Sequence, residues 1–135
     1  MSKSLQLDII TPQQTLYSGN VTSFTATGVE GSFQILFNHT PFLSALATGP
    51  MKFLSEDDQI NKYAVTGGFA HVLENKITVL VESAEKAENI DVARAHAAKE
   101  RAEARLKLND ETIDVARARA ALIRAVNRLR VSGAM

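Results

Sequence analysis

The sequence contains no cysteine, which excludes disulfide bridges, thiol nucleophiles and cysteine-ligated metal sites. No apolar run approaches the ~18 residues that a membrane-spanning helix needs. The opening segment, MSKSLQLDII, has no apolar stretch of signal-peptide length. We therefore expect a soluble protein on the cytosolic side of the membrane. With 135 residues, 45% of them hydrophobic, the chain can form one compact domain, or a small domain with an appendage.

The last 66 residues lack aromatic residues and proline, and their only glycine is Gly133. The charges divide at a similar place, although the formal net charge is zero. Residues 1–85 hold four lysines against eight acids, whereas residues 86–135 hold three lysines and all eight arginines against seven acids. The two parts therefore carry −4 and +4. This asymmetry predicts two modules, residues 1–85 and 86–135, with different partners.

The first module has the alternating pattern of short β-strands, with turn residues between them. We expect strands at residues 5–10, 21–27, 32–37, 63–66, 69–73 and 77–82. Many short strands separated by turn signals predict a sandwich or a barrel.

The second module is rich in Ala, Arg, Glu and Leu, which favour helices. Residues 109–112 separate two expected helices, and their polar side chains are expected to cap the second one. The apolar stripe of that helix comprises Val115, Ala118, Leu122, Ala125 and Leu129, and a weaker stripe on the first helix comprises Ala95, Ala98, Ala102 and Leu106. The short link favours an antiparallel hairpin. Because alanine buries little apolar area, we expect this hairpin to be marginally stable and able to detach.

The two expected helices are near copies of each other. Residues 90–108 and 113–131 match at twelve of nineteen positions without a gap. The repeat places Arg94, Arg101 and Arg105 in register with Arg117, Arg124 and Arg128, and each trio falls on one helix face. Two interpretations follow: a duplicated hairpin with solvated charged faces, or a site for a polyanion such as phosphate.

Catalysis is not indicated by any motif. Gly67-Gly68 is followed by Phe-Ala-His rather than by the Lys-Ser/Thr of a phosphate-binding loop. His39, His71 and His96 are widely spaced, so each is expected to be a structural or interface residue rather than a metal ligand. We therefore expect a protein that is not an enzyme and has no metal site.

The sequence leaves several roles open for the basic hairpin. Asp91 and Arg94 fit a helix cap with an ion pair three residues apart, or a contact to a phosphate or an adenine amino group. Nucleic acid is a further candidate, but the absence of interleaved aromatics argues against single-strand binding.

Several segments, in order along nearly the whole chain, resemble the ε subunit of bacterial F-type ATP synthases. They are Leu7-Asp8-Ile9-Ile10-Thr11-Pro12, Gly31-Ser32-Phe33-Gln34-Ile35-Leu36-Phe37-Asn38-His39-Thr40-Pro41, Val65-Thr66-Gly67-Gly68-Phe69, Ile77-Thr78-Val79-Leu80, Ile90-Asp91-Val92-Ala93-Arg94-Ala95 and Ala125-Val126-Asn127-Arg128-Leu129. The resemblance implies an α+β fold: a flattened antiparallel β-sandwich followed by a two-helix antiparallel hairpin.

The resemblance also implies a function. It implies a non-catalytic central-stalk subunit that turns with the γ subunit and the c ring, peripheral to the cytoplasmic face of the bacterial plasma membrane. The helices would inhibit ATP hydrolysis when extended toward the α/β hexamer and permit activity when folded down on the sandwich. A free-standing nucleic-acid-binding module remains the alternative.

The resemblance further implies specific binding residues. ATP, as a regulatory ligand with or without Mg²⁺, would be held by the folded hairpin through Glu85, Ile90, Asp91, Arg94, Ala95, Arg101, Arg124 and Arg128. The c ring would be contacted by the loop formed by Val29, Glu30, Gly31, Ser32 and Phe33, and the γ-facing side would lie near His39. Ser32 stands where the family commonly has an acid.

Overall fold

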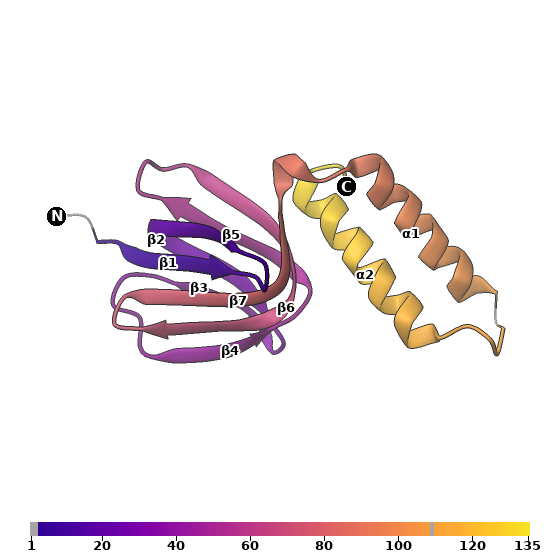
Figure 1. Ribbon diagram of the computed structural model, residues 1–135, viewed down its shortest axis with the longest axis horizontal. Coiled ribbons are helices and arrows are strands. Elements are labelled where there is room, and N and C mark those ends of the chain that lie inside the picture. The colour runs from indigo at the N-terminus through magenta and orange to yellow at the C-terminus, as the bar shows by residue number, and fades with distance from the viewer. Residues whose placement is uncertain (1–2, 109) are drawn as a thin grey trace. The chain divides into compact units, whose positions relative to one another are not determined.

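The computed structural model describes residues 3–108 and 110–135 (Figure 1). The chain divides into two compact units, Met1–Lys86 and Ala87–Met135. The first holds the strands and the second holds the helices, which confirms the predicted α+β fold of a β-sandwich followed by two helices.

Seven strands make up the described part of the first unit. They are β1 (Leu5–Ile10), β2 (Thr15–Gly28), β3 (Gly31–Ile35), β4 (Phe42–Leu46), β5 (Gly49–Ser55), β6 (Ile60–Leu73) and β7 (Lys76–Lys86). β4 and β5 are absent from the prediction because Pro41 and Pro50 lie at their starts and read as breaks. The two segments predicted around Gly67-Gly68 are one continuous strand, β6.

The sandwich closes because two long strands change partners along their length. β2 pairs with β1 over its first half and with β5 and β3 over its second half. Likewise, β6 pairs with β5 from Ile60 to Val65 and with β4 from Gly68 to Val72. Figure 1 shows β1, β7, β6 and β4 side by side in the resulting order. Pairing is antiparallel throughout the described strands except between β1 and β7, which are parallel.

Alternation along the strands separates a core from an outer face. Inward residues include Leu7, Phe24, Phe53, Val72 and Val79, each at most 1% exposed. The register puts Ile9 beside Val79 and Val79 beside Ala70, so inward side chains form continuous rows across β1, β7 and β6. The rows between them point outward.

Gly68 allows β6 and β7 to approach closely. Its φ is +141°, and a Cβ atom placed there would lie 2.0 Å from the carbonyl oxygen of Leu80. Since real Cβ atoms do not come so near to a backbone oxygen, only glycine fits at this point.

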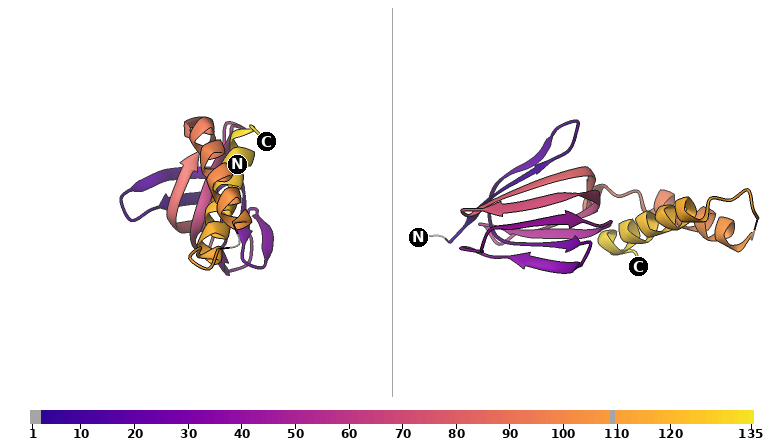
Figure 2. Two further views of the ribbon diagram at one scale, coloured as in Figure 1. Left: turned by 90° about the vertical axis from the view of Figure 1, so that its right-hand side faces the viewer. Right: turned by 90° about the horizontal axis from the view of Figure 1, so that it is seen from below.

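The second unit begins with a short 3₁₀ turn, Ala87–Asn89, followed by α1 (Val92–Lys107) and α2 (Val115–Ser132). The helices lie side by side and antiparallel, as expected (Figures 1 and 2). Two details differ from the prediction. Asp114, not a residue of 109–112, caps α2, and Asn109 lies outside the described residues. Val115 is 45% exposed, so the buried stripe of α2 begins at Ala118.

Candidate functional site

The repeated Ile-Asp-Val-Ala-Arg-Ala segments form the same local structure at the start of each helix. Asp91 and Asp114 are the N-caps of α1 and α2, with backbone angles that agree within a degree. Each carboxylate accepts a hydrogen bond of 3.0 Å from the backbone N–H of the arginine three residues later, Arg94 or Arg117. Asp91 therefore caps α1. The same carboxylate is also one of the groups predicted to contact ATP.

The small residues of the hairpin lie on its inner side. Ala95 and Ala102 of α1 and Ala118 and Ala125 of α2 are each at most 3% exposed. They recur every seven residues, so they form one stripe on each helix. We infer that the two stripes face each other along the contact between α1 and α2.

This arrangement fixes where the arginines lie. Arg94 and Arg101 each precede a buried alanine of α1 by one residue, and Arg117 and Arg124 do the same on α2. One residue is about 100° of helical rotation, so each arginine stripe flanks the helix contact. Equivalent flanks of two antiparallel helices lie on the same face of the pair. We infer that the hairpin has an arginine-rich face, which also includes Arg128.

The electrostatics of this face favour an anion. Among residues 3–108 and 110–135, no carboxylate lies within 4.0 Å of the guanidinium of Arg94, Arg101 or Arg124. Like charges gathered on one face repel each other, and a bound anion would relieve that repulsion. Guanidinium groups suit phosphate because they donate two parallel hydrogen bonds.

The remaining predicted ATP-site residues occupy two different units. Ile90 is buried, 8% exposed, and precedes Asp91, the N-cap of α1. Glu85 lies on β7 opposite Ala64 of β6, and it therefore belongs to the sandwich unit. Of the eight predicted residues, the hairpin itself supplies all except Glu85.

The predicted partner loop is a tight hairpin between β2 and β3. Gly28 pairs with Gly31, so Val29 and Glu30 form its tip, and Val29 is 64% exposed. The loop and neighbouring β4 residues line a hollow of about 400 Å³; the loop contributes Val29, Glu30, Gly31, Ser32 and Phe33. The five consecutive contact residues predicted from sequence therefore lie together.

His39, the sixth predicted contact residue, is linked to this loop through aromatic rings. Its ring lies edge-on to Phe42 at a centroid distance of 5.7 Å, and Phe42 lies edge-on to Phe33 at 5.0 Å. The Nδ1 atom of His39 is 2.7 Å from the carbonyl oxygen of Thr40, where the N–H tautomer donates a hydrogen bond. The histidine is thus held by its own loop and by Phe42.

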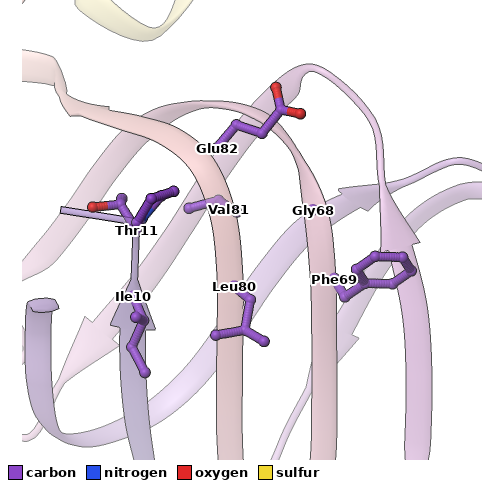
Figure 3. Close-up of a pocket in the computed structure, with 8 residues that line it drawn as sticks. Ile10, Thr11, Gly68, Phe69, Leu80, Val81 and Glu82 are labelled. Atoms are coloured by element: carbon purple, nitrogen blue, oxygen red, sulfur yellow. The ribbon is translucent and has the colours of Figure 1, made fainter. Parts of the chain in front are cut away.

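An outward apolar row on the sandwich was not predicted. We call it the apolar row: Ile10 of β1, Leu80 of β7 and Phe69 of β6, which are successive cross-strand neighbours. Leu80 is 50% exposed and Phe69 is 55% exposed. The three side chains line a hollow of about 450 Å³ (Figure 3). The sequence does contain a signal for this row. The alternation of apolar and polar residues is lost at Ile9-Ile10 and Val79-Leu80-Val81, where the outward-facing positions are also apolar.

A polar cluster borders the apolar row on β1. Asp8 accepts hydrogen bonds from the Ser18 hydroxyl at 2.6 Å and from the Gln6 amide at 3.1 Å. These bonds, with a smaller contribution from Lys76 at 3.8 Å, lower the pKa of Asp8 below its ordinary value. Asp8, which lies between β2 and β7 on the outer face of the sheet, is therefore ionised at neutral pH.

Neither a metal site nor a membrane span emerges from this geometry. In the part of the chain that the structure describes, no three His, Asp or Glu side chains converge as metal ligands would. Over the same residues, neither helix has the length and apolar character needed to cross a membrane.

Comparison with known proteins gives matches over most of the chain. Residues 4–87 match the family model for the beta-sandwich domain of the ATP synthase delta/epsilon chain, and residues 88–133 match its long alpha-helix domain. The ATP synthase epsilon chain of Desulfosudis oleivorans is 47% identical over 107 residues, covering 79% of this chain and 80% of that one. That of Nitratidesulfovibrio vulgaris is 50% identical over 106 residues, covering 78% of each chain.

Solved structures share the fold at lower identity. A chain of the Euglena gracilis mitochondrial ATP synthase, in a structure of OSCP, F1 and the c-ring, superposes with a TM-score of 0.75. It is 23% identical, and the match covers 98% of this chain and 79% of that one. A central stalk and c-ring structure of the mitochondrial ATP synthase from Tetrahymena thermophila gives a TM-score of 0.60 at 20% identity. The match covers 94% of this chain and 95% of that one.

Proposed function

This chain belongs to the delta/epsilon family of ATP synthase chains, and from that membership we propose that it is the rotor subunit that joins the c ring to the γ subunit and regulates ATP hydrolysis. It is an epsilon chain of F-type ATP synthase, a non-catalytic part of the complex. Its place is the central stalk, peripheral to the cytoplasmic face of the bacterial plasma membrane. The two units would divide the work, because they differ in charge and in architecture.

The sandwich is proposed as the docking unit. Its apolar row exposes large side chains in a continuous strip, as protein interfaces do at their centres. We assign this strip, together with the side near His39, to γ. The tip of the β2–β3 hairpin, Val29–Phe33, is assigned to the c ring. The hollow beside that tip would admit side chains of the ring.

The hairpin is proposed as the regulatory unit. The assignment rests on the arginine-rich face inferred from the helix geometry, on which Arg94, Arg101, Arg124 and Arg128 lie on one side of the two helices. In the folded state these arginines, with Asp91, Ile90, Ala95 and Glu85, would hold the triphosphate and base of ATP. In the extended state the same positive face would meet acidic surfaces of the α/β hexamer.

Regulation then follows from competition between the two states. ATP shifts the equilibrium only to the extent that it binds the folded hairpin more tightly than the extended one. The thin alanine packing between α1 and α2 keeps the cost of rearrangement small, since burying alanine stabilises little.

Calorimetry with ATP on the full chain tests the nucleotide part. We expect saturable binding at the predicted site, weakened at least about tenfold by Arg94→Gln, since a charge-assisted hydrogen bond contributes ~1.5–3 kcal/mol. The matched control is Arg119→Gln, another exposed arginine outside the predicted site. Equal affinities of the two variants would refute the assignment.

Reconstitution of the ATP synthase tests the docking and regulatory parts. Phe69→Gln with Leu80→Gln should weaken assembly with γ, whereas Leu73→Gln, which changes an exposed residue at the end of β6, should not. Removing residues 87–135 should leave assembly intact and raise ATP hydrolysis. Unchanged hydrolysis after this truncation would contradict the inhibitory role.

A further inference from the structure

The turn end of the hairpin contains a hollow that the predicted ATP site does not include. Its volume is about 340 Å³, within the lower range of small-ligand sites. Both helices and the link between them contribute to its lining: Arg105, Thr112, Ile113, Asp114, Arg117 and Ala118. All six residues belong to the same unit, so the hollow is a feature of the hairpin alone.

The internal repeat explains why this hollow has its composition. In the repeat, Ile113, Asp114, Arg117 and Ala118 are the second copies of Ile90, Asp91, Arg94 and Ala95, and Arg105 is the first copy of Arg128. A two-fold relation between antiparallel helices exchanges the two ends of the hairpin. The turn end therefore holds a second copy of five of the eight predicted ATP-site residues.

The charges in the hollow are unbalanced toward positive. Within residues 3–108 and 110–135, neither the Arg105 nor the Arg117 guanidinium has a carboxylate within 4.0 Å. The nearby Asp110 is not part of the lining; its carboxylate accepts the backbone N–H of Thr112 at 2.9 Å. Asp114 is the acid in the lining, and one of its oxygens accepts the Arg117 N–H at 3.0 Å.

We propose that this hollow is a second phosphate-binding site, in which Arg105 and Arg117 hold the phosphate group of a nucleotide or of an inorganic polyphosphate. Two arginines from opposite helices reach the same space and offer planar pairs of donors, which match phosphate oxygens. The Asp114 carboxylate repels an inorganic anion and so weakens its binding, whereas it can accept a hydrogen bond from the amino group of an adenine. The proposal extends the proposed nucleotide chemistry of the hairpin to its other end, yet its residues are separate from Arg94, Arg101, Arg124 and Arg128.

The test is a titration of the full chain with ATP and, separately, with tripolyphosphate at low salt. Binding is monitored through the backbone amide signals in NMR spectra. We expect saturable shifts of the amides of Thr112–Ala118. The double variant Arg105→Gln/Arg117→Gln should weaken binding at these amides at least about tenfold. Arg119→Gln, an exposed arginine of α2 outside the lining, should weaken it less than about twofold. Tighter binding of ATP than of tripolyphosphate identifies the nucleotide as the ligand, and equal binding identifies the phosphate group alone.

Asp114→Asn is a second informative variant, because asparagine also caps helices while lacking the charge. It should tighten tripolyphosphate binding at the turn end. No saturable shift of Thr112–Ala118 at millimolar ligand, or equal losses in Arg119→Gln and in the double variant, would overturn the second site. Shifts confined to Ile90–Ala95 would overturn it and leave the proposed ATP site standing. Shifts confined to Thr112–Ala118 would do the reverse.

Discussion

Asp91 accepts the backbone N–H of Arg94 at 3.0 Å, so the acid that the resemblance assigns to ATP already caps α1. The cap uses one carboxylate oxygen, Oδ1. Capping and ligand binding are therefore compatible, but a substitution that removes the whole side chain disturbs both. Any experiment on Asp91 has to separate these two effects.

Asp91→Ala and Asp91→Asn separate them. Alanine removes the cap and should destabilise the hairpin by about 1 kcal/mol. Asparagine keeps the cap, so helix stability should hardly change, while the loss of the carboxylate should weaken ATP binding. Thermal unfolding followed by circular dichroism measures the first effect and calorimetry measures the second. Asp114→Ala is the matched control, and it should destabilise α2 by a similar amount. If Asp91→Asn left ATP affinity unchanged, the carboxylate would be a cap only.

Gly68→Ala should be among the most damaging single substitutions in the sandwich. Both Gly68 and Gly31 have positive φ angles, +141° and +131°, but only Gly68 has a backbone oxygen within reach of an added Cβ. Gly31→Ala should therefore cost only the backbone strain, about 1–3 kcal/mol. Gly68→Ala adds a steric conflict with the Leu80 carbonyl and should exceed that cost or prevent folding. Urea unfolding of both variants compares the two, and similar losses would mean that β6 and β7 can separate locally.

Asp8 should make the sandwich sensitive to acid. Hydrogen bonds, first from Ser18 and then from Gln6, lower its pKa in the folded state. Its contribution is therefore complete above the unfolded pKa, about 3.9, and is lost as the pH falls through the lower folded pKa. Ser18→Ala should raise the pKa of Asp8 and reduce the loss of stability below about pH 4. Carboxyl NMR titration measures the pKa. An unchanged value in Ser18→Ala would show that the Ser18 bond does not hold the charge.

The sequence predicted best where periodicity and composition agree. β1 was predicted with its observed bounds, Leu5–Ile10, and each helix within two residues, because alternating or alanine-rich patterns leave few alternatives. β4 and β5 were missed since prolines at their starts read as breaks, although Pro50 lies within β5. Whether these segments form strands depends on their pairing with strands that are distant in the sequence, and local propensity does not predict that pairing.

The candidate sites divide in the same way. Repeat spacing alone was enough to place the arginines on a common side of each helix. The apolar row was not predicted, because Ile10, Phe69 and Leu80 come from three different strands and become neighbours only through the strand register. The hollow at the turn end likewise needs both helices. Features made by one element were visible in the sequence, and features made by several elements required the fold.

Packing between α1 and α2 should be sensitive to side-chain size at one position and indifferent at another on the same helix. Ala102 is 2% exposed, whereas Ala104, two residues later, is exposed. Leucine at 102 would have to enter a contact built from alanines, and overpacking costs ~1–3 kcal/mol. Ala102→Leu should therefore lower the thermal stability of the hairpin and, if ATP binds only the closed pair, weaken ATP binding in proportion.

Ala104→Leu is the matched control, because it adds the same side chain to a solvent-facing position of α1 and should change neither property. In the reconstituted ATP synthase the two variants also test the proposed regulation of ATP hydrolysis. A loosened hairpin favours the extended state, so Ala102→Leu should hydrolyse ATP more slowly than Ala104→Leu at the same ATP concentration. Faster hydrolysis by Ala102→Leu would mean that the closed hairpin, rather than the extended one, is the inhibitory form.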